Sequence, residues 1–469
     1  MPRKAKATLS QPLFQEPVFS EGVPTPDPSQ FTTTPNDNQF YTTEVNALLK
    51  TEVVSFPKAG GKPGDLFPLQ TAWGPHGSDI IAAIDSAKSI TFQMIGDSGA
   101  TATRTFGAMI KVADAVTNDF HTSTPANRPS FLFHLGDVVY NFGEALYYYD
   151  QFYDPYRDYP APIFAIPGNH DSFVLPQTPA GQEPLTIFQR QFCNPQLVVT
   201  PEAGSLHRTA MTQPGVYFAL DAPYVRIIGL FSNALEDPGV ISSQTSLTAA
   251  AAPVGKKKGG AGKGNAGSAK TWPNVPDYQL AFLTAQLQNI KTSGYTGAVI
   301  LAMHHPPFTY GTPAGGSSGG KHYGCPLMLA EIDNICKTVG VYPHAVISGH
   351  AHNYQRYTRG LNLAGKNYTV PFIICGDSGH NVDGLVKSSF GSTPKEPGDN
   401  IDVSYLDSST VFTPTTLKLN KHDQKNSGYL RVSVTSTQLT ITFNPVNRAG
   451  GPTTPDTVTV DLASHTAKG

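Results

Sequence analysis

This sequence has little cysteine, little net charge and no long apolar run. Its four cysteines form no CxxC pair and no dense framework, so neither a thiolate zinc site nor a disulfide scaffold is indicated, although a single disulfide is compatible with their spacing. Lys and Arg number 33 against 35 Asp and Glu, a net charge of −2. That balance argues against a global attraction to nucleic acid or to an acidic membrane. An anionic substrate would need a local centre to hold it, and a metal site would provide one.

The sequence also lacks a visible membrane span and a visible export signal. No stretch approaches the length that crosses a bilayer. The start, MPRKAKATLSQPLFQEP, is basic but is followed by no apolar segment, so no secretory signal is seen. We expect a soluble protein, cytoplasmic by default or the processed form of an exported one.

Two stretches of biased composition set the expected domain limits. Residues 1–40 are rich in Pro, Thr, Asn and Gln and are interpreted as an extended arm. Residues 242–270 include AAAPVGKKKGGAGKGNAGSAK, whose small residues and lysines cannot build a core, so we expect a flexible loop inserted into a folded domain. The predicted organisation is an irregular N-terminal extension over residues 1–85 and one large domain over residues 86–469.

Five short apolar runs in that domain each end in a cluster of polar residues. Their length and their β-branched or aromatic content are typical of buried strands. They are residues 90–95 before Gly96 and Asp97, 130–135 before Gly136 and Asp137, 162–166 before PGNHD, 298–303 before His304 and His305, and 345–348 before GHAH.

Helical patterns fall between these runs. Periodic apolar residues predict helices over 103–116, 277–290 and 327–339. Alternating strands and helices imply a largely parallel central sheet with crossover helices. The tail differs, because three further strand-like runs predict an antiparallel ending; they are residues 429–434, 439–443 and 457–462.

Residues able to bind a cation follow all five predicted strands. Sites in such sheets form at the carboxyl ends of strands, where loops converge. The set is Asp97, Asp137, Asn169, His304, His350 and His352. Oxygen and imidazole donors without a thiolate suit iron, zinc or manganese. Asp137 lies near the middle of the set, where a carboxylate could bridge two ions. Two ions about 3.5–4 Å apart can activate a water and neutralise phosphoryl oxygens.

Each motif taken alone also has a structural explanation. GDSG and GDVVY are compatible with ordinary turns. GNHD and GHAH are more specific, because such polar groups are costly to bury without partners. What favours a metal site is the joint occurrence of ligand types at five strand ends. GDSG recurs at residues 376–379, where we expect a structural turn, because it follows the last His pair and lacks a partner motif.

In this order the motifs resemble those of the calcineurin-like metallophosphoesterases, and the Tyr of the second motif resembles the purple acid phosphatases in particular. The motifs are GDSG at 96–99, GDVVY at 136–140, GNHD at 168–171, MHHP at 303–306 and GHAH at 349–352. They span about half the chain. The resemblance implies an α/β fold, a four-layer αββα sandwich of two mixed sheets with helices outside, carrying a binuclear site at one edge.

The resemblance also implies two metal positions and their ligands. A ferric ion would be held by Asp97, Tyr140 and His352, and a divalent iron, zinc or manganese ion by Asn169, His304 and His350. Asp137 would bridge them. His170 matches the family's outer-sphere catalytic histidine, which contacts phosphate or the leaving group. His304 is preferred to its neighbour as the ligand, because Pro306 restricts the backbone of His305. His305, His207 and His322 are further candidates for contacting phosphate. Asp171 is a candidate for a substrate contact, and it could instead orient His170 or cap a turn.

The implied reaction is hydrolysis of a phosphomonoester, of acid phosphatase type, on a small phosphorylated substrate. One alternative is a phosphodiesterase or nucleotide pyrophosphatase that uses the same metals. A rival from another class is a non-catalytic binding protein stabilised by its metals. Against the rival, every ligand position is filled, and His170 is present although no metal needs it.

Overall fold

The computed structural model describes residues 61–100, 103–140, 143–172, 185–204, 206–233, 241, 277–309, 322, 326–385, 411–412, 415–447 and 450–469. The predicted arm at residues 1–40 and the predicted loop at residues 242–270 lie outside the described residues. Residues 61–85 of the predicted extension contain the first described strand and two short helices, and that strand pairs with the rest of the fold.

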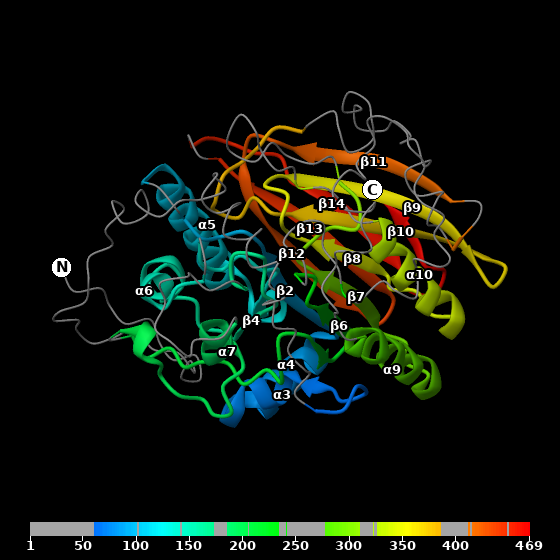
Figure 1. Ribbon diagram of the computed structural model, residues 1–469, viewed down its shortest axis with the longest axis horizontal. Coiled ribbons are helices and arrows are strands. Elements are labelled where there is room, and N and C mark those ends of the chain that lie inside the picture. Colours follow the sequence, from blue (N-terminus) through cyan, green and yellow to red (C-terminus); the bar gives the residue numbers. More distant parts are fainter. Residues whose placement is uncertain are drawn as a thin grey trace, which may run out of the picture.

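The strands form two mixed sheets (Figure 1). The eight-stranded sheet has the order β1 (Phe67–Pro68), β5 (Phe218–Ala222), β6 (Val225–Leu230), β7 (Ala298–Met303), β8 (Ala345–Ser348), β10 (Lys366–Cys375), β9 (Tyr354–Leu363), β11 (Thr416–Asp423). The seven-stranded sheet has the order β15 (Thr466–Lys468), β14 (Asp456–Asp461), β13 (Gln438–Val446), β12 (Ser427–Thr435), β2 (Ser89–Ile95), β3 (Pro129–His134), β4 (Ile163–Ala165).

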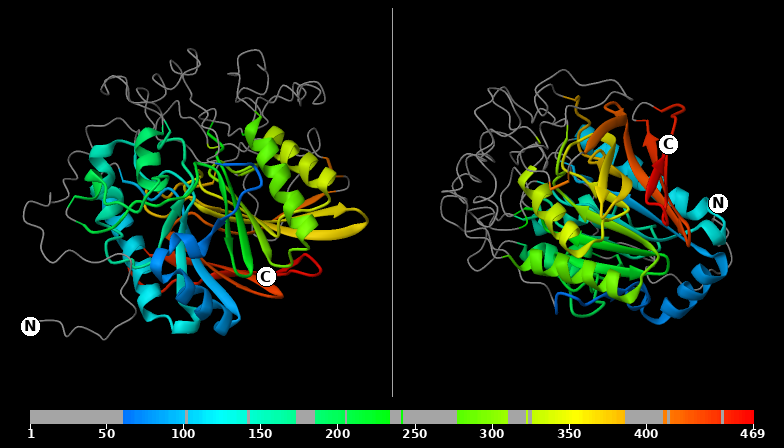
Figure 2. Two further views of the ribbon diagram at one scale, coloured as in Figure 1. Left: turned by 90° about the horizontal axis from the view of Figure 1, so that it is seen from below. Right: turned by 90° about the vertical axis from the view of Figure 1, so that its right-hand side faces the viewer.

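Helices lie outside the two sheets. The described helices are α3 (Leu69–Ala72), α4 (Gly77–Ala87), α5 (Thr103–Thr122), α6 (Ala145–Tyr148), α7 (Thr186–Phe192), α9 (Tyr278–Ser293) and α10 (Pro326–Val339), with a π-helix at Tyr149–Tyr153 and 3₁₀ turns at Gly74–His76, Pro125–Asn127 and Pro201–Ala203. α9 and α10 pack side by side against the eight-stranded sheet, whereas α4 and α5 pack on the seven-stranded sheet (Figure 2). None of the described helices is long and apolar enough to cross a membrane.

Aromatic pairs join the inner faces of the sheets. Phe133 on β3 stacks on Phe218 on β5, with ring centroids 6.0 Å apart. Tyr354 on β9 stacks on Phe443 on β13, with centroids 3.9 Å apart and planes 4° from parallel. All four rings are buried, and such pairs add about 0.5–1.5 kcal/mol each beyond the apolar area that they bury. The predicted four-layer sandwich is therefore confirmed.

The five predicted strands lie where the sequence placed them, but they do not form one central sheet. β2, β3 and β4 run parallel in one sheet, and β7 and β8 run parallel in the other. The alternation of strands and helices by itself indicated one largely parallel central sheet, which was wrong, because a buried apolar run does not show which sheet it joins. The two mixed sheets that the family resemblance implied are confirmed. The C-terminal strands β12, β13 and β14 are antiparallel as predicted, and β12 extends the first of these sheets by pairing with β2.

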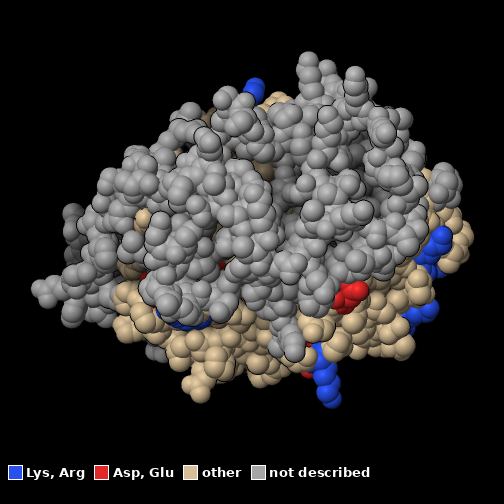
Figure 3. All heavy atoms as spheres, viewed as in Figure 1, with Lys and Arg blue, Asp and Glu red and all other residues tan. Residues whose placement is uncertain are grey.

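The described surface carries few charged side chains on the face seen in Figure 3, where most atoms that are not grey belong to residues other than Lys, Arg, Asp and Glu. This agrees with the 14% of charged residues in the chain. The buried carboxylates include Asp97, Asp137 and Asp171, which follow the strand ends described next.

Candidate metal centre

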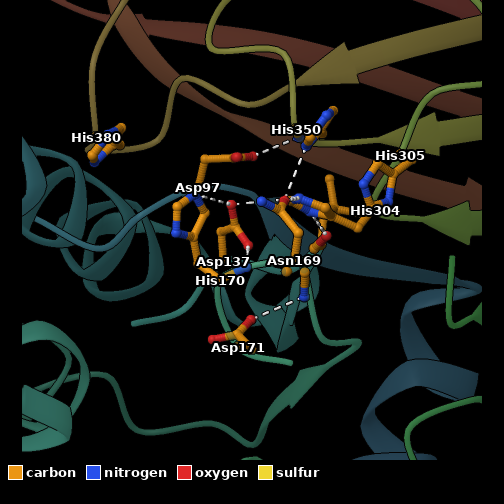
Figure 4. Close-up of polar contacts among 12 residues, drawn as sticks. Asp97, Asp137, Asn169, His170, Asp171, His304, His305, His350 and His380 are labelled. Atoms are coloured by element: carbon orange, nitrogen blue, oxygen red, sulfur yellow. Dashed lines mark hydrogen bonds and ion pairs between the residues drawn. The ribbon is translucent and has the colours of Figure 1, made fainter. Parts of the chain in front are cut away.

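The carboxyl ends of parallel strands from both sheets meet at one edge of the sandwich. β2, β3 and β4 bring Asp97, Asp137 and Asn169 from one sheet, and β7 and β8 bring His304 and His350 from the other (Figure 4). All five side chains are buried. The main-chain N–H of His350 donates to Oδ2 of Asp97 at 2.8 Å, although the two residues are 253 positions apart in the chain. The fold therefore brings distant parts of the sequence together at this site.

Three of these residues have a left-handed backbone conformation. Asp97, Asp137 and His350 have φ values of 55°, 56° and 66°. For a residue with a Cβ this conformation costs about 1–2 kcal/mol, and such strain tends to gather at functional sites. At each of these strand ends the residue with the left-handed conformation is therefore the candidate ligand. The preceding Gly349 is needed because of close approach: a Cβ there would lie 2.6 Å from Oδ2 of Asp97.

One half of the site is built around the amide oxygen of Asn169. Oδ1 of Asn169 lies 3.0 Å from Nε2 of His304 and 3.1 Å from Nδ1 of His350. Nδ1 of His304 lies 2.9 Å from the carbonyl oxygen of Leu135. Because a carbonyl oxygen only accepts, Nδ1 of His304 carries a proton and donates it to Leu135.

The other half of the site is built around Tyr140 and His352. The hydroxyl of Tyr140 donates to Oδ1 of Asp97 at 3.3 Å and lies 3.3 Å from Nε2 of His352. Nε2 of His352 lies 3.4 Å from the same carboxylate oxygen of Asp97. Burial opposes a charge on His352, but the carboxylates of Asp383 and Asp97 outweigh it and raise the pKa of His352 well above its usual value.

Asp137 lies between the two halves. Its Oδ2 is 3.5 Å from Nε2 of His304 and 4.0 Å from Nε2 of His170, and its Oδ1 accepts from the main-chain N–H of His170 at 2.9 Å. Burial opposes the charge of Asp137, but His304 and His170 outweigh it and hold the pKa of Asp137 well below its usual range. Burial raises the pKa of Asp97 and outweighs the opposing effect of His304 and His352.

The donor atoms fit a metal ion. One ligand atom each from Asp97, Asp137 and His304 lies within 4.8 Å of the others, and all three side chains are buried. Burial disfavours a charged His304, yet the carboxylates of Asp137 and Asp97 raise its pKa to about 9. Without a metal, a second proton on His304, at Nε2, compensates the negative charge of Asp137 and Asp97. A cation would satisfy the same atoms, and oxygen and imidazole donors suit iron, zinc or manganese.

His350 supports the same conclusion from the other side of Asn169. Its Nε2 is buried and has no hydrogen-bond partner among the described residues. Burial, together with the nearby His305 and His322, holds the pKa of His350 well below its usual value, so the ring is neutral. A buried neutral imidazole surrounded by other imidazoles is a suitable metal ligand.

The structure also places the three residues predicted to act on substrate. The ring of His170 packs on Tyr140 with centroids 4.2 Å apart, beside Asp137. His305 lies next to His350, with centroids 4.2 Å apart, and its Nδ1 is 2.9 Å from the hydroxyl of Ser232. Both rings therefore border the candidate metal ligands.

Asp171 has a different environment. Its carboxylate accepts hydrogen bonds from the main-chain N–H groups of Gly168, Val138 and Val139 at 3.0–3.1 Å. Burial, with a smaller contribution from Asp137, raises the pKa of Asp171 to about 6. These bonds join the loops that follow β3 and β4, and so hold the two strand ends together.

The second GDSG, expected to be a turn without a partner, lies directly against the first. The main-chain N–H groups of Ser378 and His380 donate to the carbonyl oxygens of Gly96 and Asp97 at 3.1 and 3.0 Å. The ring of His380 stacks on Tyr140, with centroids 3.9 Å apart and planes 6° from parallel. Residues 376–380 are therefore part of the site, and their position after an apolar run, like that of the first GDSG, was the signal that could have indicated it.

A protein family and several solved structures are similar to this chain. The family described as calcineurin-like phosphoesterase matches residues 94–354, more than half of the chain. No curated protein matches the sequence. Among solved structures, the purple acid phosphatase PPD1 from yellow lupin (Lupinus luteus) seeds is 14% identical, with a TM-score of 0.44, over 80% of this chain and 54% of that one. This chain thus spans about half the length of the lupin protein.

Two further solved structures are similar at comparable levels. GAP50, the anchor in the inner membrane complex of Plasmodium, is 13% identical, with a TM-score of 0.40, over 78% of this chain and 88% of that one. A dimetal phosphatase from Danio rerio is 10% identical, with a TM-score of 0.35, over 78% of this chain and 98% of that one.

Proposed function

The chain belongs to the calcineurin-like phosphoesterase family, and from this premise we propose that it is a binuclear phosphomonoesterase of purple acid phosphatase type. Metal-dependent hydrolysis of a phosphoester is the activity of the family. The number of metal ions, their identity and the class of ester are the parts that the proposal adds.

The proposal assigns the metal ligands to the two halves of the site. Asp97, Tyr140 and His352 would hold an Fe(III) ion, and Asn169, His304 and His350 would hold a divalent iron, zinc or manganese ion. Asp137, which lies between the halves, would bridge the two. The observation that carries the proposal is the convergence of buried acceptor atoms from Asp97, Asp137 and His304 within 4.8 Å, because such atoms require a compensating cation.

Two metal ions bound there would lower the pKa of a water and neutralise phosphoryl oxygens. The remaining work falls to histidines of this chain. His170 borders Asp137 and is the group proposed to hydrogen-bond a phosphoryl oxygen or to protonate the leaving oxygen. His305 and His322 pack against His350, with ring centroids 4.2 and 4.4 Å from it, and are proposed to contact other phosphoryl oxygens.

Asp171 would act through position rather than contact. Its hydrogen bonds to three main-chain amides keep the loops of Asp137 and Asn169 at a constant separation. For the other predicted role, a substrate contact, at least one carboxylate oxygen of Asp171 would have to give up its hydrogen bonds to these main-chain N–H groups.

The test measures metal content and ester preference on the same preparation. We expect two metal ions per chain by elemental analysis, and faster release of p-nitrophenol from p-nitrophenyl phosphate than from bis(p-nitrophenyl) phosphate. Faster cleavage of the bis-ester would assign the chain to the phosphodiesterases. Two bound metals with no hydrolysis of either ester would favour a non-catalytic binding protein.

A further inference from the structure

His304 and His352, one candidate ligand from each half of the site, differ in the group that faces Nδ1. Nδ1 of His304 donates to the carbonyl oxygen of Leu135 at 2.9 Å, which is a neutral acceptor. Nδ1 of His352 instead faces the carboxylate of Asp383, with Oδ2 at 3.5 Å. The partner behind a metal-bound imidazole sets its orientation and its basicity. The Tyr140 half of the site therefore has a negative charge behind its histidine, and the His304 ligand of the other half does not.

The position of Asp383 is defined by its main chain as well as by its side chain. Its N–H donates to the carbonyl oxygen of His352 at 2.8 Å, and its carbonyl oxygen accepts from Nδ2 of Asn353 at 3.2 Å. The side chain is only 25% exposed. Main-chain bonds to the residue that it orients, and to the next one, keep the carboxylate next to the His352 ring.

The segment that carries Asp383 also contacts the other ligands of the same half. His380 stacks on Tyr140, and its main-chain N–H donates to the carbonyl oxygen of Asp97 at 3.0 Å. One segment, residues 376–383, thus supports Asp97, Tyr140 and His352, the three side chains proposed to bind Fe(III).

The charges of the two halves are unequal as a result. Asp97, Asp383 and a Tyr140 phenolate would surround one ion, whereas the other ion would have neutral Asn169 and neutral imidazoles, with Asp137 shared. We propose that Asp383 is a positioning residue that orients His352 and makes the Tyr140 half selective for a trivalent over a divalent ion. This inference rests on the proposed function.

The experiment compares substitutions that separate charge from orientation. Asp383→Asn keeps an acceptor for Nδ1 of His352 and removes the charge, whereas Asp383→Ala removes both. Asp221→Asn is the matched control: its carboxylate also pairs with a cation, Arg226 at 2.9 Å, its side chain is 34% exposed, and it lies at the opposite end of the sheet. Each variant is loaded with iron, and Fe(III) affinity is measured by competition with a chelator.

Loss of an outer-shell partner typically costs about 10–100-fold in metal affinity. We expect Fe(III) affinity to fall at least about 10-fold in Asp383→Asn and further in Asp383→Ala, with the divalent ion retained. The phenolate-to-iron absorption should move to longer wavelength, because a less basic His352 leaves the iron poorer in electrons. Asp383→Glu should restore part of the affinity, and Asp221→Asn should match the wild type. A merely structural role of Asp383 would instead loosen both ions together and leave the band in place.

The two levels of inference fail differently. Wild-type Fe(III) affinity and an unmoved band in Asp383→Asn would overturn the role of Asp383 while leaving the proposed function intact. A wild-type protein that takes up no iron would overturn the proposed function and this inference with it. Should Asp383→Asn not fold, Asp383→Ser, which also lacks the charge, gives the same comparison.

Discussion

The stacked imidazoles of His344 and His465 should make the protein lose stability in mild acid. Their ring centroids lie 4.3 Å apart, with planes 11° from parallel. His344 precedes β8 of the eight-stranded sheet, and His465 lies in the turn between β14 and β15 of the other sheet. The pair therefore joins the two sheets at the amino end of β8, the end opposite to the one that His350 follows.

The hydrogen bonds around the pair define neutral rings. The main-chain N–H of Val299 donates to Nδ1 of His344 at 3.0 Å, so this nitrogen carries no proton. The Nε2 atoms of His344 and His465 face the carbonyl oxygens of Leu462 and Pro343 at 3.3 and 2.9 Å, and so donate. A proton on Nδ1 of His344 would break its bond from Val299. Burial lowers the pKa of His344 to about 4, and burial together with the neighbouring His344 lowers that of His465 to about 3.

The size of the effect follows from linkage. In the folded protein both histidines have pKa values below the value of about 6.5 that they have in the unfolded chain. Between the folded and the unfolded pKa values the unfolded chain therefore binds more protons, and the free energy of unfolding decreases as the pH drops below about 6.5. At pH 5 each histidine should cost about 2 kcal/mol, since one pH unit corresponds to about 1.4 kcal/mol. The pair together should cost about 4 kcal/mol relative to pH 7.

Urea unfolding at pH 7 and pH 5 tests this prediction. His465→Asn removes one titrating ring, and Asn tolerates the φ of 56° at this turn. The stability lost between pH 7 and pH 5 should be about 2 kcal/mol smaller in the variant than in the wild type. Comparing the two proteins cancels the titration of the metal centre, which both contain. An equal loss in the two proteins would refute the assignment of a neutral, buried His465.

Three further predictions concern the candidate metal centre. Asp137→Asn removes a charge shared by both ions, so elemental analysis should find at least one of them lost or bound far more weakly; two tightly held ions with near-normal turnover would show that Asp137 does not bridge. Tyr140→Phe should bleach or shift the visible absorption of the iron-loaded protein while the fold is retained, and a colourless, iron-loaded wild type would exclude a phenolate ligand. His170→Ala should keep both ions and reduce kcat by about 10²–10⁴, with a smaller loss for substrates that have good leaving groups. Metal loss in parallel with activity, at unchanged activity per bound pair, would show instead that His170 braces the Asn169 loop.

Local sequence signals were sufficient for the strand ends. The strands before Asp97, Asp137 and His304 end within one residue of the predicted positions. Burial on both faces requires continuous apolar residues, and the polar cluster that follows cannot extend the strand. The order of the motifs was also enough to indicate the family, and the match of the family to residues 94–354 confirms it. The strands β9, β10 and β11 were not predicted, since they mix polar and apolar residues without a single clear period.

The sequence by itself determined which residue types stand at the strand ends, since spacing and chemistry are local properties. Only the tertiary structure decided that these strands belong to two sheets whose carboxyl ends meet, because strand partners are chosen by pairing between distant segments. The same long-range packing placed His380 on Tyr140 and Asp383 behind His352. His380 directly follows the second GDSG, but Asp383 belongs to no motif that marks it as a neighbour of His352, so only the folded backbone reveals that contact.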